Sequence, residues 1–286
     1  MSRFAYVNGA YVPHGQAQVH VEDRGYQFSD GVYEVSAVWG GRVIDEDLHL
    51  DRLERSLAEL RIDMPVPRSV IKVTTAETLR KNRINDGIIY LQITRGVAPR
   101  DHAFPHDPVG SIVMTARASK WPDIATDTGA EVATVVDIRW DRRDIKSVSL
   151  LANILAKQEA RERGAYEAWL IDKDGGVYEG SSTNAWMVDD AGRLITRELS
   201  NDILQGITRT TVIRLAREHG FEVIERPFSV DEAKSAPEAF LTSTTSFIKG
   251  VVSIDGHKVG DGKPGPVTRR LQQIYLDYCR GPGANA

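Results

Sequence analysis

A stretch without a regular pattern, residues 117–129, divides this chain and carries Pro122. On each side of it, strand-like runs alternate with runs whose apolar residues recur at helical spacing. The strand-like runs include 31–39, 87–95, 110–116 and 131–140, and the helical runs include 45–60, 70–81, 149–163 and 208–219. This alternation predicts an α/β (α+β) protein of two domains, residues 1–120 and 121–286.

Composition and charge exclude several classes of protein. The 286 residues are 41% apolar, enough for a sizeable core, and a net charge of −4 gives no reason to expect nucleic acid or an anionic membrane as partner. Cys279 is the only cysteine, which excludes an intrachain disulfide and a cysteine-rich metal site. No apolar run reaches the roughly 18–20 residues of a membrane span, and the N-terminal residues lack the apolar core of a signal peptide. We therefore expect a cytoplasmic protein.

Lys146 lies in the segment Asp144-Ile145-Lys146-Ser147, between a strand-like run and a helical run. A lysine does covalent chemistry when its amine can be neutral, which burial and neighbouring cations favour. The alternative is an ordinary surface lysine. The residues that follow in the chain favour the chemical interpretation.

Two polar turns follow Lys146. Glu179 ends a strand-like run and opens the sequence Glu179-Gly180-Ser181-Ser182-Thr183-Asn184, and Gly206-Ile207-Thr208-Arg209 opens a helical run. The start of a helix presents free backbone N–H groups, which suit a phosphate. The local alternatives are a surface carboxylate for Glu179 and plain helix capping by Thr208.

Two further segments could bind phosphate. Residues 242–246 are five consecutive hydroxyl residues after an apolar strand, which form either a phosphate cup or a polar turn. Arg52 lies on the first helical run, and a guanidinium pairs with phosphate oxygens in bidentate fashion. Its alternative is an Arg–Asp pair on a solvent-exposed helix face.

The loop 94–102 is the segment that bears most on the substrate, because it ends in Arg100 and His102. A flexible loop with a guanidinium and an imidazole is suited to binding a carboxylate. His102 and His106 also have the i, i+4 spacing of a metal pair. Pro105 argues against a helix there and no acidic or cysteine ligand is suitably spaced, so we expect no metal.

A lysine, a carboxylate and two hydroxyl- and glycine-rich turns are what a protein needs to hold pyridoxal 5'-phosphate. The lysine binds the cofactor and later moves the Cα proton, the acid faces the pyridine nitrogen, and the turns hold the phosphate. Together and in this order, these segments resemble the fold-type IV pyridoxal-phosphate aminotransferases and, among them, the D-amino-acid branch. The resemblance covers nearly the whole chain, from Glu22 to Ser246.

The resemblance implies a role for each of these residues. Lys146 is the catalytic residue, and Glu179 lies at the pyridine nitrogen. The other implied cofactor contacts are Arg52, Ser182, Leu204, Ile207, Thr208, Ser243 and Thr244. The implied substrate contacts are Tyr33, Tyr90, Arg100 and His102. In that family the arginine and the histidine come from the neighbouring subunit, which implies a homodimer with shared active sites.

The implied fold has a small N-terminal α/β two-layer domain and a larger C-terminal α/β barrel-like domain. The implied reaction moves an amino group from a D-amino acid such as D-alanine to 2-oxoglutarate or pyruvate by a ping-pong mechanism. The alternatives on the same scaffold are a branched-chain L-aminotransferase, an (R)-amine transaminase and an aminodeoxychorismate lyase, and Arg100 and His102 weigh against them. A non-catalytic cofactor-binding protein is a further alternative, but Lys146 and Glu179 are both present.

Overall fold

The computed structural model describes residues 3–281, which divide into two compact units. The first unit consists of the described parts of Met1–Trp121, Ile145–Ser149 and Cys279–Ala286, and the second consists of Pro122–Asp144 and Leu150–Tyr278. The segment with Lys146 therefore belongs to the first unit, although the sequence pattern counted it with the second domain. The predicted fold class, a mixed α/β protein of fold type IV, is confirmed.

The first unit is built on a six-stranded antiparallel sheet with the order β2-β1-β6-β5-β3-β4. Its strands are β1 (Phe4–Val7), β2 (Ala10–Pro13), β3 (Gly31–Trp39), β4 (Arg42–Val43), β5 (Gly87–Thr94) and β6 (Ser111–Ala118). Its helices are the short α1 (Arg24–Phe28), then α2 (Glu46–Glu59) and α3 (Arg68–Asn82), and a 3-10 turn covers His14–Gln16.

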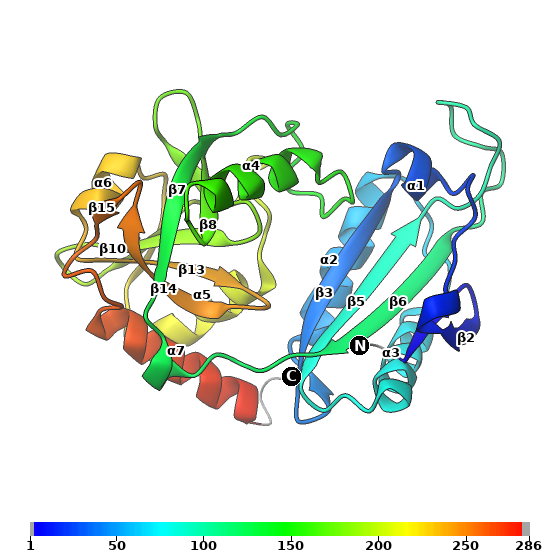
Figure 1. Ribbon diagram of the computed structural model, residues 1–286, viewed down its shortest axis with the longest axis horizontal. Helices are drawn as coiled ribbons and strands as arrows, with labels where there is room; N and C mark the ends of the chain where they lie inside the picture. Colours follow the sequence, from blue (N-terminus) through cyan, green and yellow to red (C-terminus); the bar gives the residue numbers. More distant parts are fainter. Residues whose placement is uncertain (1–2, 282–286) are drawn as a thin grey trace. The chain divides into compact units, whose positions relative to one another are not determined.

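Helices α2 and α3 pack against one face of this sheet (Figure 1). The apolar residues at helical spacing on α2 account for the packing, because Leu50, Leu53 and Leu57 fall on one side of the helix and are buried. They meet the apolar side chains of one strand face, among them Val32 and Leu91. Side chains alternate between the two faces along a strand, so the neighbours of these two residues, Tyr33 and Tyr90, lie on the opposite face.

The second unit is built on a nine-stranded mixed sheet with the order β12-β11-β10-β13-β14-β7-β8-β9, in which β15 pairs with β14. The strands are β7 (Ala130–Val136), β8 (Glu167–Ile171), β9 (Val177–Gly180), β10 (Asn184–Val188), β11 (Leu194–Thr196), β12 (Val223–Glu225), β13 (Glu238–Ser243), β14 (Phe247–Ile254) and β15 (His257–Lys258). The helices are α4 (Leu151–Glu162), α5 (Ile207–Glu218), α6 (Val230–Ser235) and α7 (Pro266–Arg280), with a 3-10 turn at Ile124–Thr126. The sheet curls into a half-barrel, as expected.

The strand predicted for residues 131–140 is too long, because β7 ends at Val136. The chain leaves the sheet at Asp137, which forms an ion pair with Arg139 at 2.8 Å. Arg139 in turn reaches Glu179. The departure from the strand therefore places a charged residue beside a candidate site residue. Within residues 3–281, no helix is both long and apolar enough to cross a bilayer.

Candidate active site

The segment with Lys146 runs alongside β3 and is joined to it by an isolated β-bridge. Val32 and Ser147 form an antiparallel bridge, and the Tyr33 N–H donates to the Lys146 carbonyl at 3.0 Å. Residues opposite each other in antiparallel strands point to the same face, and their neighbours point to the other face. Lys146 therefore shares a sheet face with Tyr33, away from the helices.

The Lys146 amine lies over the ring of Tyr33, with Nζ 4.1 Å from the ring centroid. Tyr90 is next to Tyr33, and the two ring centroids are 5.8 Å apart. The Tyr90 hydroxyl donates to Gln92 Oε1 at 2.7 Å. Burial raises the pKa of Tyr90 to about 12, and the neighbouring Tyr33 adds to the rise. Tyr90 therefore stays protonated at neutral pH and acts as a donor.

Arg52 is buried on α2, on the helix side of the sheet, and pairs with an acid from β3. Its Nε and Nη2 donate to the two oxygens of Glu34 at 2.8 and 2.7 Å. His49 Nδ1 lies 2.7 Å from Glu34 Oε2. The alternative of an Arg–Asp pair in solvent is wrong, because the guanidinium is only 7% exposed and its acid lies on another element.

Glu34 is a buried anion. Burial by itself would raise the pKa of Glu34, but the Arg52 guanidinium and the hydrogen bonds from Arg52 and His49 lower it to about 2. Burial lowers the pKa of His49, so its ring is neutral at pH 7. The ionised Glu34 then accepts a hydrogen bond from Nδ1–H, which fixes the tautomer. This triad holds Arg52 in one orientation.

Glu179 lies at the end of β9 and is buried, so the alternative of a surface carboxylate is wrong. Arg139 Nη1 donates to its Oε1 at 2.6 Å, and Asn184 Nδ2 donates to its Oε2 at 3.0 Å. The Leu204 N–H lies 3.2 and 3.1 Å from the two oxygens. Burial raises the pKa of the Glu179 carboxyl, and the Arg139 guanidinium opposes the rise. Such a carboxylate is oriented and is a better proton acceptor than one in water.

Helix α5 begins at an N-cap glycine, Gly206, and no side chain caps it. Thr208 is buried inside the first turn, so the alternative in which it caps the helix is wrong. A Cβ added to Gly206 would lie 2.0 Å from Asn184 Oδ1, so a larger residue does not fit. Asn184 also donates to the Leu204 carbonyl at 3.0 Å, which ties the start of α5 to Glu179. The N–H groups of Ile207 and Thr208 at such a start suit an anion.

The other expected phosphate and cofactor residues lie in two polar turns. Ser182 Oγ donates to Glu167 Oε2 at 2.8 Å, and Glu167 is fully buried. Residues 244–246 form the turn between β13 and β14 and include Thr244. Ser243 Oγ accepts a hydrogen bond from the Ser246 N–H at 3.0 Å. The hydroxyl run is thus an ordered turn at the end of a buried strand.

Arg100 and His102 are exposed on the loop before β6 and meet at Phe28. The Arg100 guanidinium carbon lies 4.5 Å from the Phe28 ring centroid, and the His102 ring lies 5.5 Å from it. Arg24 Nη1 donates to the Asp101 carbonyl at 2.6 Å and anchors the loop between them. In residues 3–281, no hydrogen bond, ion pair or ring contact joins this pair to the two tyrosines on the sheet. The structure thus forms two separate groups of predicted substrate residues.

Sequence reasoning missed four side chains that support the site. They are Glu34, His49, Arg139 and Asn184. The sequence did indicate a pairing for Glu34, because it lies within a mostly apolar strand-like run. A charged residue in such a run is usually buried, and a buried charge needs a partner of opposite charge. Arg139 and Asn184 carried none, since nothing in their local sequence indicates a contact with Glu179.

The residues of the two units fit pyridoxal phosphate in chemical type. The first unit offers an amine beside an aromatic ring and a buried, oriented guanidinium, and the second offers a buried carboxylate and an uncapped helix start. In the described part of the chain, no three His, Cys, Asp or Glu side chains are grouped to hold a metal ion.

Comparison with known proteins gives the family. The model for amino-transferase class IV matches residues 31–254, and the chain belongs to this family. It is 39% identical over 274 residues to a D-alanine aminotransferase of Staphylococcus haemolyticus, which covers 96% of each protein. It is 40% identical over 274 residues to a D-alanine aminotransferase of Listeria monocytogenes serotype 4b, which covers 95% of this chain and 94% of that protein.

Solved structures of branched-chain amino acid aminotransferases share the fold. One from T.th., determined with pyridoxamine 5'-phosphate, has a TM-score of 0.93 and 27% identity, and the match covers 100% of this chain and 97% of that one. Another, from Escherichia coli, has a TM-score of 0.85 and 28% identity, and the match covers 96% of this chain and 94% of that one.

Proposed function

We propose that this chain is a D-amino-acid aminotransferase that uses pyridoxal 5'-phosphate. It moves the amino group of a D-amino acid such as D-alanine to 2-oxoglutarate or pyruvate by a ping-pong mechanism. The observation that carries the proposal is the pair Arg100 and His102, a guanidinium and an imidazole held on one exposed loop around Phe28. The name and the nearly full coverage of the two D-alanine aminotransferases support it.

When bound, pyridoxal phosphate supplies an electron sink for the negative charge that forms at the substrate Cα. Glu179 would hold a proton at the pyridine nitrogen, and its bonds from Arg139 and the Leu204 N–H keep it oriented. Leu204 would pack against the ring. The phosphate would be bound by Arg52, Ile207, Thr208, Ser243 and Thr244, with Ser182 nearby.

Lys146 would take the proton from the substrate Cα and return it to the product. The amine does this only in its neutral form. Its position opposite Tyr33, in the segment that is bridged to β3, limits its reach to one sheet face. Proton return from one fixed side gives one hand of amino acid.

The substrate carboxylate would be bound by Tyr33, Arg100 and His102, with Tyr90 in support. Within the described part of one chain, these residues form two groups that do not contact each other. We infer that the Arg100 and His102 of one subunit serve the site of a second copy, so that the enzyme is a homodimer with shared active sites. A loop that is exposed in one chain is free to do this.

An exposed apolar patch on the second unit supports the homodimer. It consists of residues at the end of β7, on the segment after it and on the first turns of α4, which are Val136, Ile138, Trp140, Leu151, Ile154 and Leu155. Because β7 and β8 are parallel, α4 returns along them and its start lies near the carboxyl end of β7. Ile154 is 60% exposed in the single chain. Large apolar patches of this kind mark interfaces.

A charge placed in this patch is expected to break the homodimer. Ile154→Glu should shift the protein to monomers at micromolar concentration and lower its activity, since a buried unpaired carboxylate is costly. Sedimentation velocity checks the mass. Val73→Glu on α3 is the matched control, because Val73 is 69% exposed on a helix outside the patch. A monomeric parent protein, or an unchanged mass for Ile154→Glu, contradicts the inference.

A donor screen tests the activity itself. Half-reactions with D-alanine, L-leucine and (R)-1-phenylethylamine are followed by the loss of the bound cofactor's absorbance band. We expect D-alanine to react and L-leucine not to react, because the carboxylate is bound on one side only. Reaction with L-leucine but not with D-alanine would contradict the proposal and would instead support a branched-chain amino acid aminotransferase, the activity named for the solved structures.

Arg100→Ala should lower kcat/KM for D-alanine about tenfold to a hundredfold, the value of a lost hydrogen bond between charged groups. The reaction with (R)-1-phenylethylamine should change by less than about twofold, because this amine has no carboxylate. Arg117→Ala, which removes an exposed arginine from β6, is the control. Equal losses for both donors would remove the carboxylate role from Arg100.

A further inference from the structure

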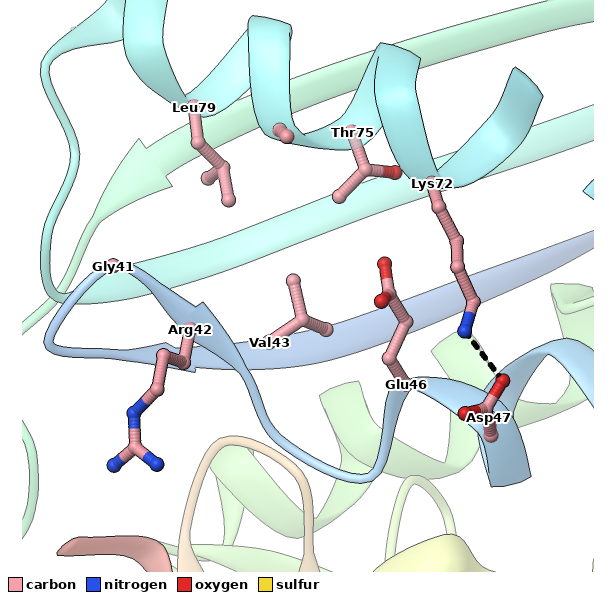
Figure 2. Close-up of a pocket in the computed structure, with 9 residues that line it drawn as sticks. Gly41, Arg42, Val43, Glu46, Asp47, Lys72, Thr75 and Leu79 are labelled. Carbon is pink, nitrogen blue, oxygen red and sulfur yellow. Dashed lines mark ion pairs between the residues drawn. The ribbon is translucent and has the colours of Figure 1, made fainter. Parts of the chain in front are cut away.

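A cavity of about 260 Å³ lies in the first unit, beside β4 and between the start of α2 and the middle of α3. It is lined by Gly41, Arg42, Val43, Glu46, Asp47, Lys72, Thr75, Ala76 and Leu79 (Figure 2). None of these residues belongs to the proposed cofactor or substrate contacts. An apolar cavity of about 150 Å³ takes up benzene, which has six heavy atoms, so by the same ratio this one has room for roughly ten.

Among the lining residues, Glu46 carries the acidic group that makes no hydrogen bond or ion pair with a side chain of the described residues. Figure 2 shows its carboxylate pointing into the space between β4 and α3. In residues 3–281 no hydrogen bond or ion pair reaches it from another side chain. Burial raises the pKa of Glu46, and the nearby Lys72 and Arg68 charges, both of which are paired with Asp47, oppose the rise. A half-buried carboxylate without a donor favours a cation from solution.

The other charged lining groups are already paired. Lys72 Nζ lies 2.7 Å from Asp47 Oδ1, and Arg68 Nη2 lies 2.8 Å from the same oxygen. Arg42 donates to the carbonyls of residues 279–281 at 2.7 to 3.2 Å and points away from the cavity. The lining therefore does not suit an anion, because Glu46 would repel it and each cationic group of the lining is already paired.

The remaining lining favours an apolar tail. Val43, Ala76 and Leu79 present aliphatic groups, and Thr75 presents a hydroxyl beside them. A second, smaller cavity of about 20 Å³ shares Val43, Glu46 and Thr75 with the first. That volume is enough for about one water molecule. Glu46 is therefore poorly hydrated on its inner side, so an ion pair made there is screened less than one at the surface.

We propose that this cavity binds a small organic cation, an alkylammonium group with a short aliphatic tail. The ammonium group pairs with Glu46, and the tail lies against Val43, Ala76 and Leu79. The site is independent of the proposed activity, because it uses none of the residues assigned to cofactor or substrate.

The test uses n-butyltrimethylammonium, which has eight heavy atoms and cannot react with the cofactor aldehyde. Binding to the full-length holoenzyme is measured by ligand-observed NMR titration, with 1-hexanol and hexanoate as a neutral and an anionic probe. We expect a dissociation constant on the order of 1 mM for the cation. The neutral probe should bind more weakly, and hexanoate should not bind.

Two variants separate charge from shape. Glu46→Gln keeps the shape and should weaken binding of the cation about tenfold, with little effect on 1-hexanol. Ala76→Phe keeps Glu46 but fills the cavity and should abolish binding of both. Glu131→Gln, which neutralises an exposed carboxylate on β7, is the control. Equal affinity of Glu46→Gln and the parent, binding that survives Ala76→Phe, or no binding of the cation overturns the proposal.

Discussion

Replacing Lys146 by alanine is expected to lower the rate of amino transfer from D-alanine to pyruvate by about 10⁴-fold, the upper end of what a positioned base contributes. No other residue of Ile145–Ser149 can take over the proton, because Lys146, whose amine lies over Tyr33, is the only lysine of this segment. Single-turnover kinetics at saturating donor measure the loss. The cofactor absorbance band of the parent protein should also shift.

Lys173→Ala is the matched control, because Lys173 is exposed in the turn between β8 and β9. Its turnover should equal that of the parent protein. Full turnover by Lys146→Ala would refute the assignment of the catalytic base, and with it the proposed chemistry.

Glu34→Gln is expected to lower the free energy of unfolding by about 3–5 kcal/mol, because it leaves the buried Arg52 guanidinium without an anion. The amide keeps the size of the side chain, so the loss reports charge rather than packing. Urea unfolding curves measure it. Cofactor affinity should fall as well, since Glu34 holds both Nε and Nη2 of Arg52.

The control for Glu34 is Glu77→Gln on α3. Glu77 also has its pKa lowered to about 2, in this case by Arg80, but the pair is open to solvent. Water screens such a pair, so little change in stability is expected. Equal losses of unfolding free energy in the two variants would show that burial does not make the Glu34 ion pair more stabilising than an exposed one.

The effect of Glu34→Gln should depend on pH. The pKa of Glu34 falls from an ordinary value of 4.5 to about 2 on folding, so the unfolded chain binds this proton more readily. The stabilisation is complete above about pH 4.5 and is lost as the pH falls toward 2. The difference in stability between the parent and the variant should therefore shrink over this window.

Local sequence was sufficient where neighbouring residues make the feature. The alternation of strand and helix patterns predicted the fold class, and the apolar residues at helical spacing predicted a helix within residues 45–60. Glu179 at a strand end and Gly206 at a helix start were identified because turns and helix starts depend on a few adjacent residues. The strand prediction at β7 was wrong beyond Val136, and there Arg139 contacts Glu179, forty positions later in the chain.

The sequence by itself determined which groups are present: an amine at Lys146, an acid at Glu179, a glycine-led helix start at Gly206 and a guanidinium–imidazole loop at Arg100. Only the tertiary structure decided what surrounds them. It placed Lys146 on the face of Tyr33 by bridging a distant segment of the chain to β3, and it joined Glu34 to Arg52 by packing α2 on β3. The physical reason is that burial and charge pairing depend on distances in space. The local sequence around a residue does not indicate a contact with another residue eighteen or a hundred positions away.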